Sequence, residues 1–258
     1  MRPTSKLLNL LQANAKRGEF RAEGNTIYLY DVIVSSDAEA EWFGGVSAET
    51  FVKALAGMSG DVALHINSPG GDVFGGVAMA QAIRAYSGKV TAHIDGLAAS
   101  AASAVAVAAD EAIMAPGSML MIHNAWTIAL GNRHDFMDTA ALLEKIDGDL
   151  AQAYAKRAGG EASTFATMMD AETWMTADEA VQAGLADSLA PEKTINNLAK
   201  FDLSAFGAVP APQNDTVTVT VIVEIEDTDD AADAVETATA NAEHRARLHA
   251  VRLLQPCA

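Results

Sequence analysis

The stretch Asp61-Val-Ala-Leu-His-Ile-Asn-Ser-Pro-Gly-Gly71 joins a β-strand pattern to a sharp turn. Residues 61–67 are typical of a strand, and the Ser-Pro-Gly-Gly sequence marks its end. Residues 73–86 then predict a helix that stops near Gly88, and residues 89–95 predict the next strand, closed by Gly96. A strand, a turn, a helix and a further strand form a βαβ unit, which predicts a mainly parallel sheet.

The same alternation extends in both directions from this unit. Elements are predicted as strands at 26–34, 111–114 and 119–123, and as helices at 47–58, 98–109 and 134–157. The helix at 98–109 consists almost wholly of small residues, which indicates close packing on several sides. A capping box, Thr176-Ala-Asp-Glu179, opens one more short helix. The fold class is therefore α/β.

Composition limits the classes of function. The chain has 258 residues and a formal net charge of −17, which argues against nucleic acid or an anionic membrane as the main partner. Its one cysteine, Cys257, cannot form an internal disulfide, and no Cys/His cluster suggests structural zinc. The most apolar stretch, residues 97–109, is too short to span a bilayer. We expect a soluble, cytoplasmic protein.

Three regions are predicted along the chain. Residues 1–25 form a helical or loose leader, and residues 26–200 form the α/β domain. Residues 201–258 form an acidic, partly disordered appendage, because no Lys or Arg occurs from Phe201 to His244.

Two glycine-containing turns are candidates for chemistry. After Asn67-Ser-Pro-Gly-Gly71, backbone N–H groups can point into a cavity and hold a developing oxyanion. In Gly96-Leu-Ala-Ala-Ser100, a serine stands at the start of a helix, where negative charge is favoured. The first turn alone is equally consistent with an ordinary strand-to-helix turn. Ser100 alone fits a buried serine of an alanine-rich helix better than a nucleophile, and Ser103 is its natural control.

Met121-Ile-His123 supplies a candidate general base at the end of an apolar strand, since the pKa of histidine lies near neutrality. His65 and His93 fall inside predicted strands and are interpreted as structural.

Taken in order, these motifs resemble the ClpP peptidase family over roughly residues 26–190. The resemblance implies a ClpP/crotonase-like fold of repeated ββα units with a long protruding helix. It implies Ser100 as nucleophile and His123 as base, with the N–H groups of Gly71 and Ala101 as the oxyanion hole. No metal or organic cofactor is implied.

The third triad member is an acid, which in this family stands two residues before an aromatic residue. The position two residues before Trp174 holds Glu172 instead of Asp. A Glu can orient an imidazole as an Asp does in other triads, although its extra methylene requires a shifted backbone or rotamer. Asp170 is the alternative acid.

The resemblance also implies a homo-oligomeric ring or double ring, stacked through the helix at 134–157, that hydrolyses unfolded proteins or peptides. The leader, the inserted Trp42-Phe-Gly-Gly-Val46 and the acidic tail are most similar to phage- and prophage-encoded ClpP-related head-maturation proteases. This predicts capsid or scaffold proteins as substrates, within assembling procapsids, and leaves the need for a partner ATPase open.

Two rival functions share this fold. One is a crotonase-type acyl-CoA hydratase or isomerase, which would need carboxylates near the cavity and no Ser/His pair. The other is a non-catalytic structural subunit.

Overall fold

The computed structural model describes residues 5–191 and 201–210. Contacts divide the chain into two units, Met1–Ala211 and Pro212–Ala258, and every described residue belongs to the first. The expectations for residues 211–258 therefore lie outside the described residues. Among the described residues, no helix combines the length and hydropathy needed to cross a membrane.

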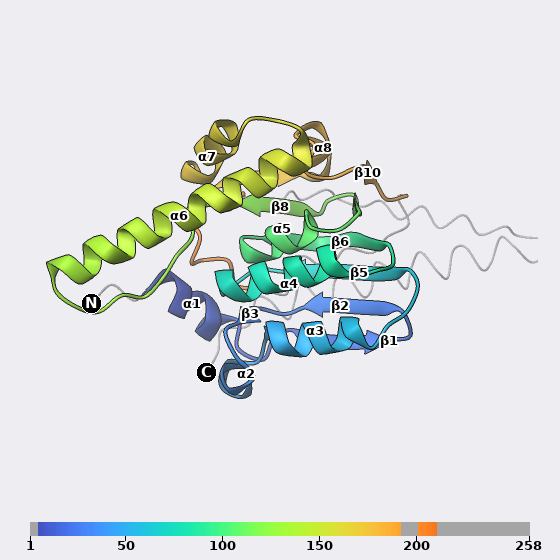
Figure 1. Cartoon of the computed structure of the whole chain (residues 1–258), viewed down its shortest axis with the longest axis horizontal. Helices are drawn as coiled ribbons and strands as arrows, with labels where there is room; N and C mark the ends of the chain where they lie inside the picture. Colours follow the sequence, from blue (N-terminus) through green and yellow to red (C-terminus); the bar gives the residue numbers. More distant parts are fainter. Residues whose placement is uncertain (1–4, 192–200, 211–258) are drawn as a thin grey trace, which may run out of the picture. The chain divides into compact units, whose positions relative to one another are not determined.

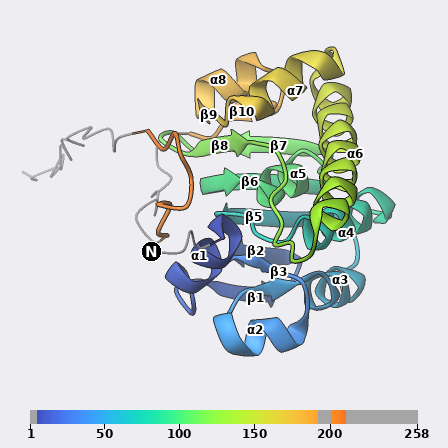
Figure 2. The same ribbon diagram turned by 90° about the vertical axis from the view of Figure 1, so that its left-hand side faces the viewer.

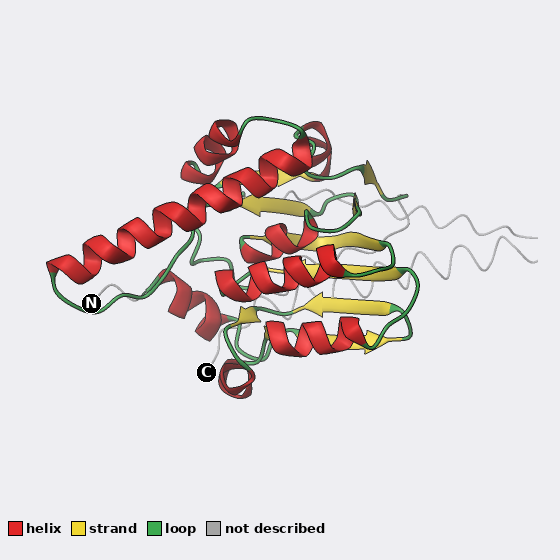
Figure 3. Cartoon of the chain, in the orientation of Figure 1, coloured by secondary structure: helices red, strands yellow, loops and turns green. Residues whose placement is uncertain are grey.

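The first unit is built on an eight-stranded sheet (Figures 1 and 3). Its strands are β1 (Glu19–Glu23), β2 (Thr26–Tyr30), β5 (Val62–Ser68), β6 (Val90–Ala99), β7 (Glu111–Met114), β8 (Met119–Ile122), β9 (Thr173–Thr176) and β10 (Ser188–Leu189). Strands β2, β5, β6, β7 and β10 run parallel, as the βαβ pattern predicts. The edge pairs β1–β2 and β8–β9 are antiparallel, and β3 (Ile33–Val34) pairs with β4 (Val46–Ser47) in a separate small sheet.

The sheet branches at β6, which is the longest strand. Residues Thr91–Ile94 pair with β7, and residues Leu97–Ala99 pair with β8. Strand β8 therefore runs parallel beside the carboxyl-terminal half of β6. Because the two strands point the same way, the residues that follow them emerge at one edge of the sheet.

The helices are α1 (Lys6–Ala13), α2 (Asp37–Phe43), α3 (Ala48–Ala56), α4 (Val73–Ala85), α5 (Ala101–Ala106), α6 (Arg133–Ala158), α7 (Ala162–Asp170) and α8 (Ala177–Gln182). Helices α3, α4 and α6 lie on one face of the sheet, whereas α1 lies near the carboxyl ends of the parallel strands (Figure 2). The main apolar core forms between the sheet and these covering helices. Helix α5 is buried along its whole length, as expected from its small side chains.

Several boundaries differ from the predictions. The strand at 26–34 is divided into β2 and β3, and the small-residue helix begins at Ala101, three residues later than expected, because Ala98 and Ala99 continue β6. Helix α4 ends before Tyr86 and not at Gly88. Helices α2 and α7 were not predicted. The capping box at Thr176 is confirmed: the Thr176 hydroxyl accepts from the Glu179 N–H, and the Glu179 carboxylate accepts from the Thr176 N–H.

The outer regions also differ from the expected division. The leader contains α1 and β1, and β1 extends the main sheet by pairing with β2. Residues 201–210, assigned to the appendage from their composition, belong to the first unit. Phe201 and Phe206 are both buried there. Phe206 packs in an apolar cluster with Leu10 of α1 and with Leu97 and Met121 of the sheet.

Candidate active site

Ser100 stands at a sharp bend between β6 and α5. Its backbone has φ 55° and ψ −126°, a conformation that non-glycine residues rarely adopt. The bend is fixed by pairing on one side, where the Ser100 N–H donates to the Met121 carbonyl at 2.9 Å. On its other side the bend lies close against Gly70: a Cβ added at Gly70 would be only 2.8 Å from the Ser100 Cβ. Only glycine fits there, which gives the Ser-Pro-Gly-Gly turn a physical role.

His123 follows β8 and meets Ser100 directly. The His123 Nε2 and the Ser100 Oγ are 2.7 Å apart, within hydrogen-bond reach for a base and its nucleophile. The branching of the sheet explains the meeting, since β6 and β8 are parallel neighbours and both residues lie just beyond their ends. Residues 23 positions apart in the chain are thereby paired, as the resemblance implies.

The imidazole of His123 is enclosed by aromatic rings. Only 6% of the residue is exposed, and its ring meets Trp126 edge-on at 4.4 Å between centroids and Phe206 at 5.6 Å. Burial lowers the pKa of His123 to about 4, opposed by the charge of Glu172 and assisted by that of Lys6. The imidazole is therefore neutral at pH 7, which is the form that accepts a proton.

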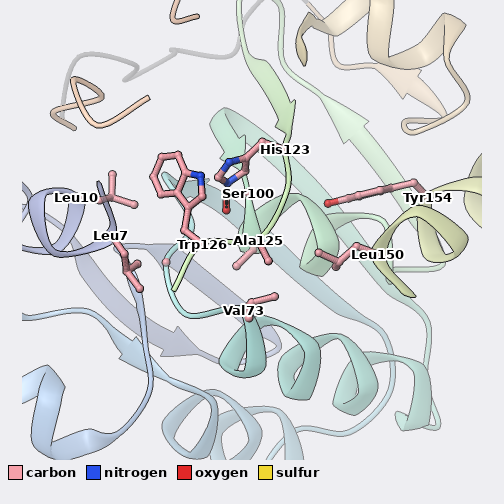
Figure 4. A pocket seen from close by; sticks show the side chains of 11 residues that line it. Leu7, Leu10, Val73, Ser100, His123, Ala125, Trp126, Leu150 and Tyr154 are labelled. Carbon is pink, nitrogen blue, oxygen red and sulfur yellow. Dashed lines mark hydrogen bonds between the residues drawn. The ribbon is translucent and has the colours of Figure 1, made fainter. Parts of the chain in front are cut away.

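Ser100 and His123 open onto a narrow pocket (Figure 4). Figure 4 shows the imidazole next to the Ser100 side chain, with the indole of Trp126 beside it. The wall is mainly apolar and comes from α1, the turn after β5, α4, α5, α6 and the loop after β8. Its other residues are Leu7, Leu10, Gly71, Val73, Ala101, Ala125, Trp126, Leu150 and Tyr154.

The expected oxyanion-hole residues, Gly71 and Ala101, both lie on this wall with Ser100. Gly71 has φ +143°, and a Cβ there would lie 2.0 Å from the carbonyl oxygen of Ile33, so glycine is required. Ala101 is the first residue of α5, where a helix leaves its N–H groups without partners in its own hydrogen-bond ladder. Both positions suit donors directed at the pocket.

The two candidate acids, Glu172 and Asp170, have different hydrogen-bond partners. Glu172 has φ +50° in the turn between α7 and β9, and its Oε1 accepts hydrogen bonds from the N–H groups of Gly207 at 2.7 Å and Ala208 at 2.8 Å. Asp170 accepts instead from the Asn124 side chain at 2.7 Å. Within the described residues, neither carboxylate hydrogen-bonds His123. Of the two, only Glu172 is among the charges that affect the pKa of His123.

Two other histidines of the sheet lie outside the lining of this pocket. His65 and His93 stack on neighbouring strands with 4.8 Å between ring centroids, and the His65 Nδ1 lies 2.7 Å from a carboxylate oxygen of Asp95.

Sequence reasoning missed the residues that contact the His123 ring and the Glu172 carboxylate. Phe206, Gly207 and Ala208 belong to a segment whose acidic composition suggested an appendage, and Trp126 was not singled out. The signal that could have found the segment is its pair of phenylalanines, Phe201 and Phe206, in a stretch otherwise poor in aromatic residues.

Comparison with known proteins identifies the class. The model of the Clp protease family matches residues 31–193. The ATP-dependent Clp protease proteolytic subunit of Pleurastrum terricola is 29% identical over 164 residues, which are 63% of this chain and 84% of that protein. The subunit of the same name from Bacteroides fragilis is 32% identical over 135 residues, covering 52% and 65% respectively.

A solved structure of a ClpP1 mutant from Listeria monocytogenes has a TM-score of 0.53 at 20% identity, covering 67% of this chain and 92% of that one. This likeness supports the fold. The family model spans more than half of the chain, so the chain belongs to the Clp protease family. Its class is that of a serine-type peptidase with the ClpP-like α/β fold.

Proposed function

We propose that this protein is a serine endopeptidase in which Ser100 is the nucleophile and His123 the general base. The observation that supports this most directly is the 2.7 Å contact between the Ser100 Oγ and the Nε2 of a neutral His123, at the wall of a pocket. His123 takes the hydroxyl proton as Ser100 attacks a peptide carbonyl. The protonated imidazole then gives this proton to the leaving amine, which departs and leaves an acyl-enzyme.

The oxyanion of the tetrahedral intermediate lies between the N–H groups of Gly71 and Ala101, which line the pocket beside Ser100. Water then attacks the acyl-enzyme, with His123 again accepting a proton, and releases the acid product and the free serine. Each step uses groups of this chain, the substrate and water, so the proposed reaction needs neither a metal nor an organic cofactor.

The test compares two serines three residues apart. Ser100→Ala is expected to lower the kcat for a fluorogenic peptide by about 10⁴-fold or more, because removal of a triad nucleophile leaves only binding and oxyanion stabilisation. Ser103→Ala is the matched control: Ser103 is buried in α5 and its Oγ donates to the Ser100 carbonyl, outside the pocket wall. Unchanged hydrolysis by Ser100→Ala would overturn the assignment.

The contact between Ser100 and His123 also separates this proposal from its rivals. A crotonase-type enzyme has no use for a serine in hydrogen-bond contact with a histidine at the pocket. A non-catalytic subunit would leave the strained backbone of Ser100 without a function. Reaction with a serine-directed phosphonate, without turnover of acyl-CoA substrates, is the expected result.

We further propose that the protein assembles into a homo-oligomeric ring or double ring through α6. The support is apolar surface on that helix and the loop before it: Phe136, Met137, Leu142, Ile128 and Leu130 are all at least half exposed. Monomers rarely leave such residues grouped in water. Enclosure would restrict substrates to unfolded proteins or peptides. A monomer by light scattering at micromolar concentration would contradict the proposal.

The proposed natural substrates are phage capsid or scaffold proteins, cleaved in the cytoplasm or within assembling procapsids. The support comes from two features outside the family match, the leader and the acidic region after residue 200. Incubation with purified capsid and scaffold proteins of the same prophage, with Ser100→Ala as control, is the direct test. Absence of cleavage there, with intact peptidase activity, would remove this substrate class.

A further inference from the structure

The segment 201–210 lies beyond the family match at 31–193, yet it contacts the proposed active site. Its Phe206 is 6% exposed and meets three rings: His123 at 5.6 Å, Trp126 at 5.1 Å and Trp174 at 5.6 Å between centroids. Most residues of this segment are apolar, and Phe206 packs in one cluster with Trp126 and Trp174. The segment is therefore part of the site's surroundings.

The next two residues of the segment bind the candidate acid. The N–H groups of Gly207 and Ala208 both donate to Oε1 of Glu172, at 2.7 and 2.8 Å, and the indole N–H of Trp174 donates to the same oxygen at 3.4 Å. Hydrogen bonds to an ionised acceptor are stronger than those between neutral groups. Among the described residues, Oε2 of Glu172 has no hydrogen-bond donor, so this oxygen is available to another group.

The segment does not cover the nucleophile. The residues that line the pocket beside Ser100 include His123 and Trp126, but none from 201–210. The segment thus packs behind the imidazole and leaves the side that faces the serine open. This placement fits support of the site and not its blockage.

The far end of the segment is fixed by the leader. Asn14, fully buried after α1, donates from its side-chain amide to the Asp202 carbonyl at 2.8 Å and accepts from the Asp202 N–H at 2.6 Å. A side-chain amide paired with both the N–H and the C=O of one residue fixes the backbone of that residue closely. The segment is consequently held both at residue 202 and at residues 206–208.

We propose that segment 201–210 is a positioning element of the active site, whose amides at Gly207 and Ala208 hold the Glu172 carboxylate for His123. A Glu has one more rotatable bond than the Asp usual at this position, so its carboxylate needs an anchor. With Oε1 held by the two amides, Oε2 accepts a hydrogen bond from the Nδ1–H of the imidazole when His123 takes the serine proton. This inference rests on the proposed function.

The test removes one N–H without touching the catalytic side chains. Ala208→Pro deletes a donor to Glu172, and we expect kcat for peptide hydrolysis to fall about tenfold with KM unchanged, in line with the loss of a hydrogen bond to a charged group. Val209→Pro is the matched control, because no hydrogen bond of its N–H is found among the described residues. Gly207→Pro removes the other donor and replaces Ala208→Pro if that variant does not fold.

The decisive arm repeats Ala208→Pro in a Glu172→Gln background. If the amide acts through the carboxylate, the two substitutions together lower kcat no further than Glu172→Gln alone. For stability the background is Glu172→Ala, which removes the acceptor itself: there Ala208→Pro should lower the melting temperature less than in the parent, which tests the contact independently of catalysis. An equal effect of Ala208→Pro in both backgrounds, no effect, or an increase in kcat would each overturn the inference.

Different results would refute the proposed peptidase activity and the positioning role of segment 201–210. An inactive parent protein that does not react with a phosphonate would refute the proposed peptidase, and the positioning role with it. An active parent with additive effects of Ala208→Pro and Glu172→Gln would refute only the positioning role.

Discussion

Burial of the His123 imidazole leads to a prediction about pH. The pKa of His123 falls from 6.5 to about 4, chiefly because Trp126 and Phe206 exclude water from the ring. At about 1.4 kcal/mol per pKa unit, this is about 3 kcal/mol against the imidazolium. If His123 is the base, kcat/KM should stay constant from pH 8 down to about pH 5 and fall by half near pH 4.

The perturbation is Phe206→Ala, which opens one side of the imidazole to water. The pKa of His123 should then rise toward 6.5, so the acidic limb of kcat/KM should move up by about one pH unit or more. The assay is hydrolysis of a fluorogenic peptide over pH 4–8, with activity at pH 7.5 measured again after each acid exposure to exclude unfolding. Trp42→Ala, an aromatic truncation at a residue 79% exposed, is the control and should not move the limb.

The free energy of unfolding should also depend on protonation of the His123 imidazole. Because the folded pKa of His123 lies below the unfolded value, the unfolded state binds the extra proton between pH 6.5 and 4. As the pH falls from 6.5 to 4, protonation of this group should therefore lower the free energy of unfolding by up to about 3 kcal/mol. His123→Gln should remove this contribution to the pH dependence of stability.

Two results would refute this account of the imidazole. One is an acidic limb of kcat/KM near pH 6.5 in the parent, and the other is a limb at the same pH in the parent and in Phe206→Ala.

Three further variants test other parts of the structure. Ser103→Ala leaves the buried hydroxyl of Tyr154 without its 2.8 Å partner and should lower the free energy of unfolding by about 1–3 kcal/mol, measured by urea denaturation, with peptidase activity retained. Gly70→Ala places a Cβ 2.5 Å from a backbone oxygen at the serine bend, so loss of phosphonate labelling is expected in protein that still folds by circular dichroism. Asn14→Ala removes both hydrogen bonds to the backbone of Asp202 and should speed hydrogen exchange in residues 201–210; unchanged exchange would show that the amide does not hold the segment.

The order of strands, turns and helices was predictable because their local signals agree with the sheet they form. The turn at Gly70 and Gly71 ends a strand in the sequence and in the structure alike. The small-residue stretch was harder, since alanine favours helices but Ala98 and Ala99 pair with β8 and extend β6. Tertiary pairing therefore overrides local propensity next to Ser100. The positive φ of this serine has no signature in the sequence.

The surroundings of the imidazole could not be predicted from motifs. Glu172 was predicted to orient His123, but its carboxylate bonds Gly207 and Ala208, 35 and 36 residues further along. Backbone N–H groups exist at every non-proline residue, so no residue type marks those that bind a side chain. Composition likewise indicated an appendage from residue 201, although Phe206 reaches the site. Both the partners of Glu172 and the place of Phe206 are set by contacts between residues far apart in the sequence.

The most direct test of the central claim is to locate the adduct of a serine-directed phosphonate by peptide mass spectrometry. The proposed chemistry predicts a single modified serine, Ser100, whose labelling disappears in His123→Gln and persists in Ser103→Ala. Modification of a different serine, or labelling of Ser100 that does not depend on His123, would contradict it.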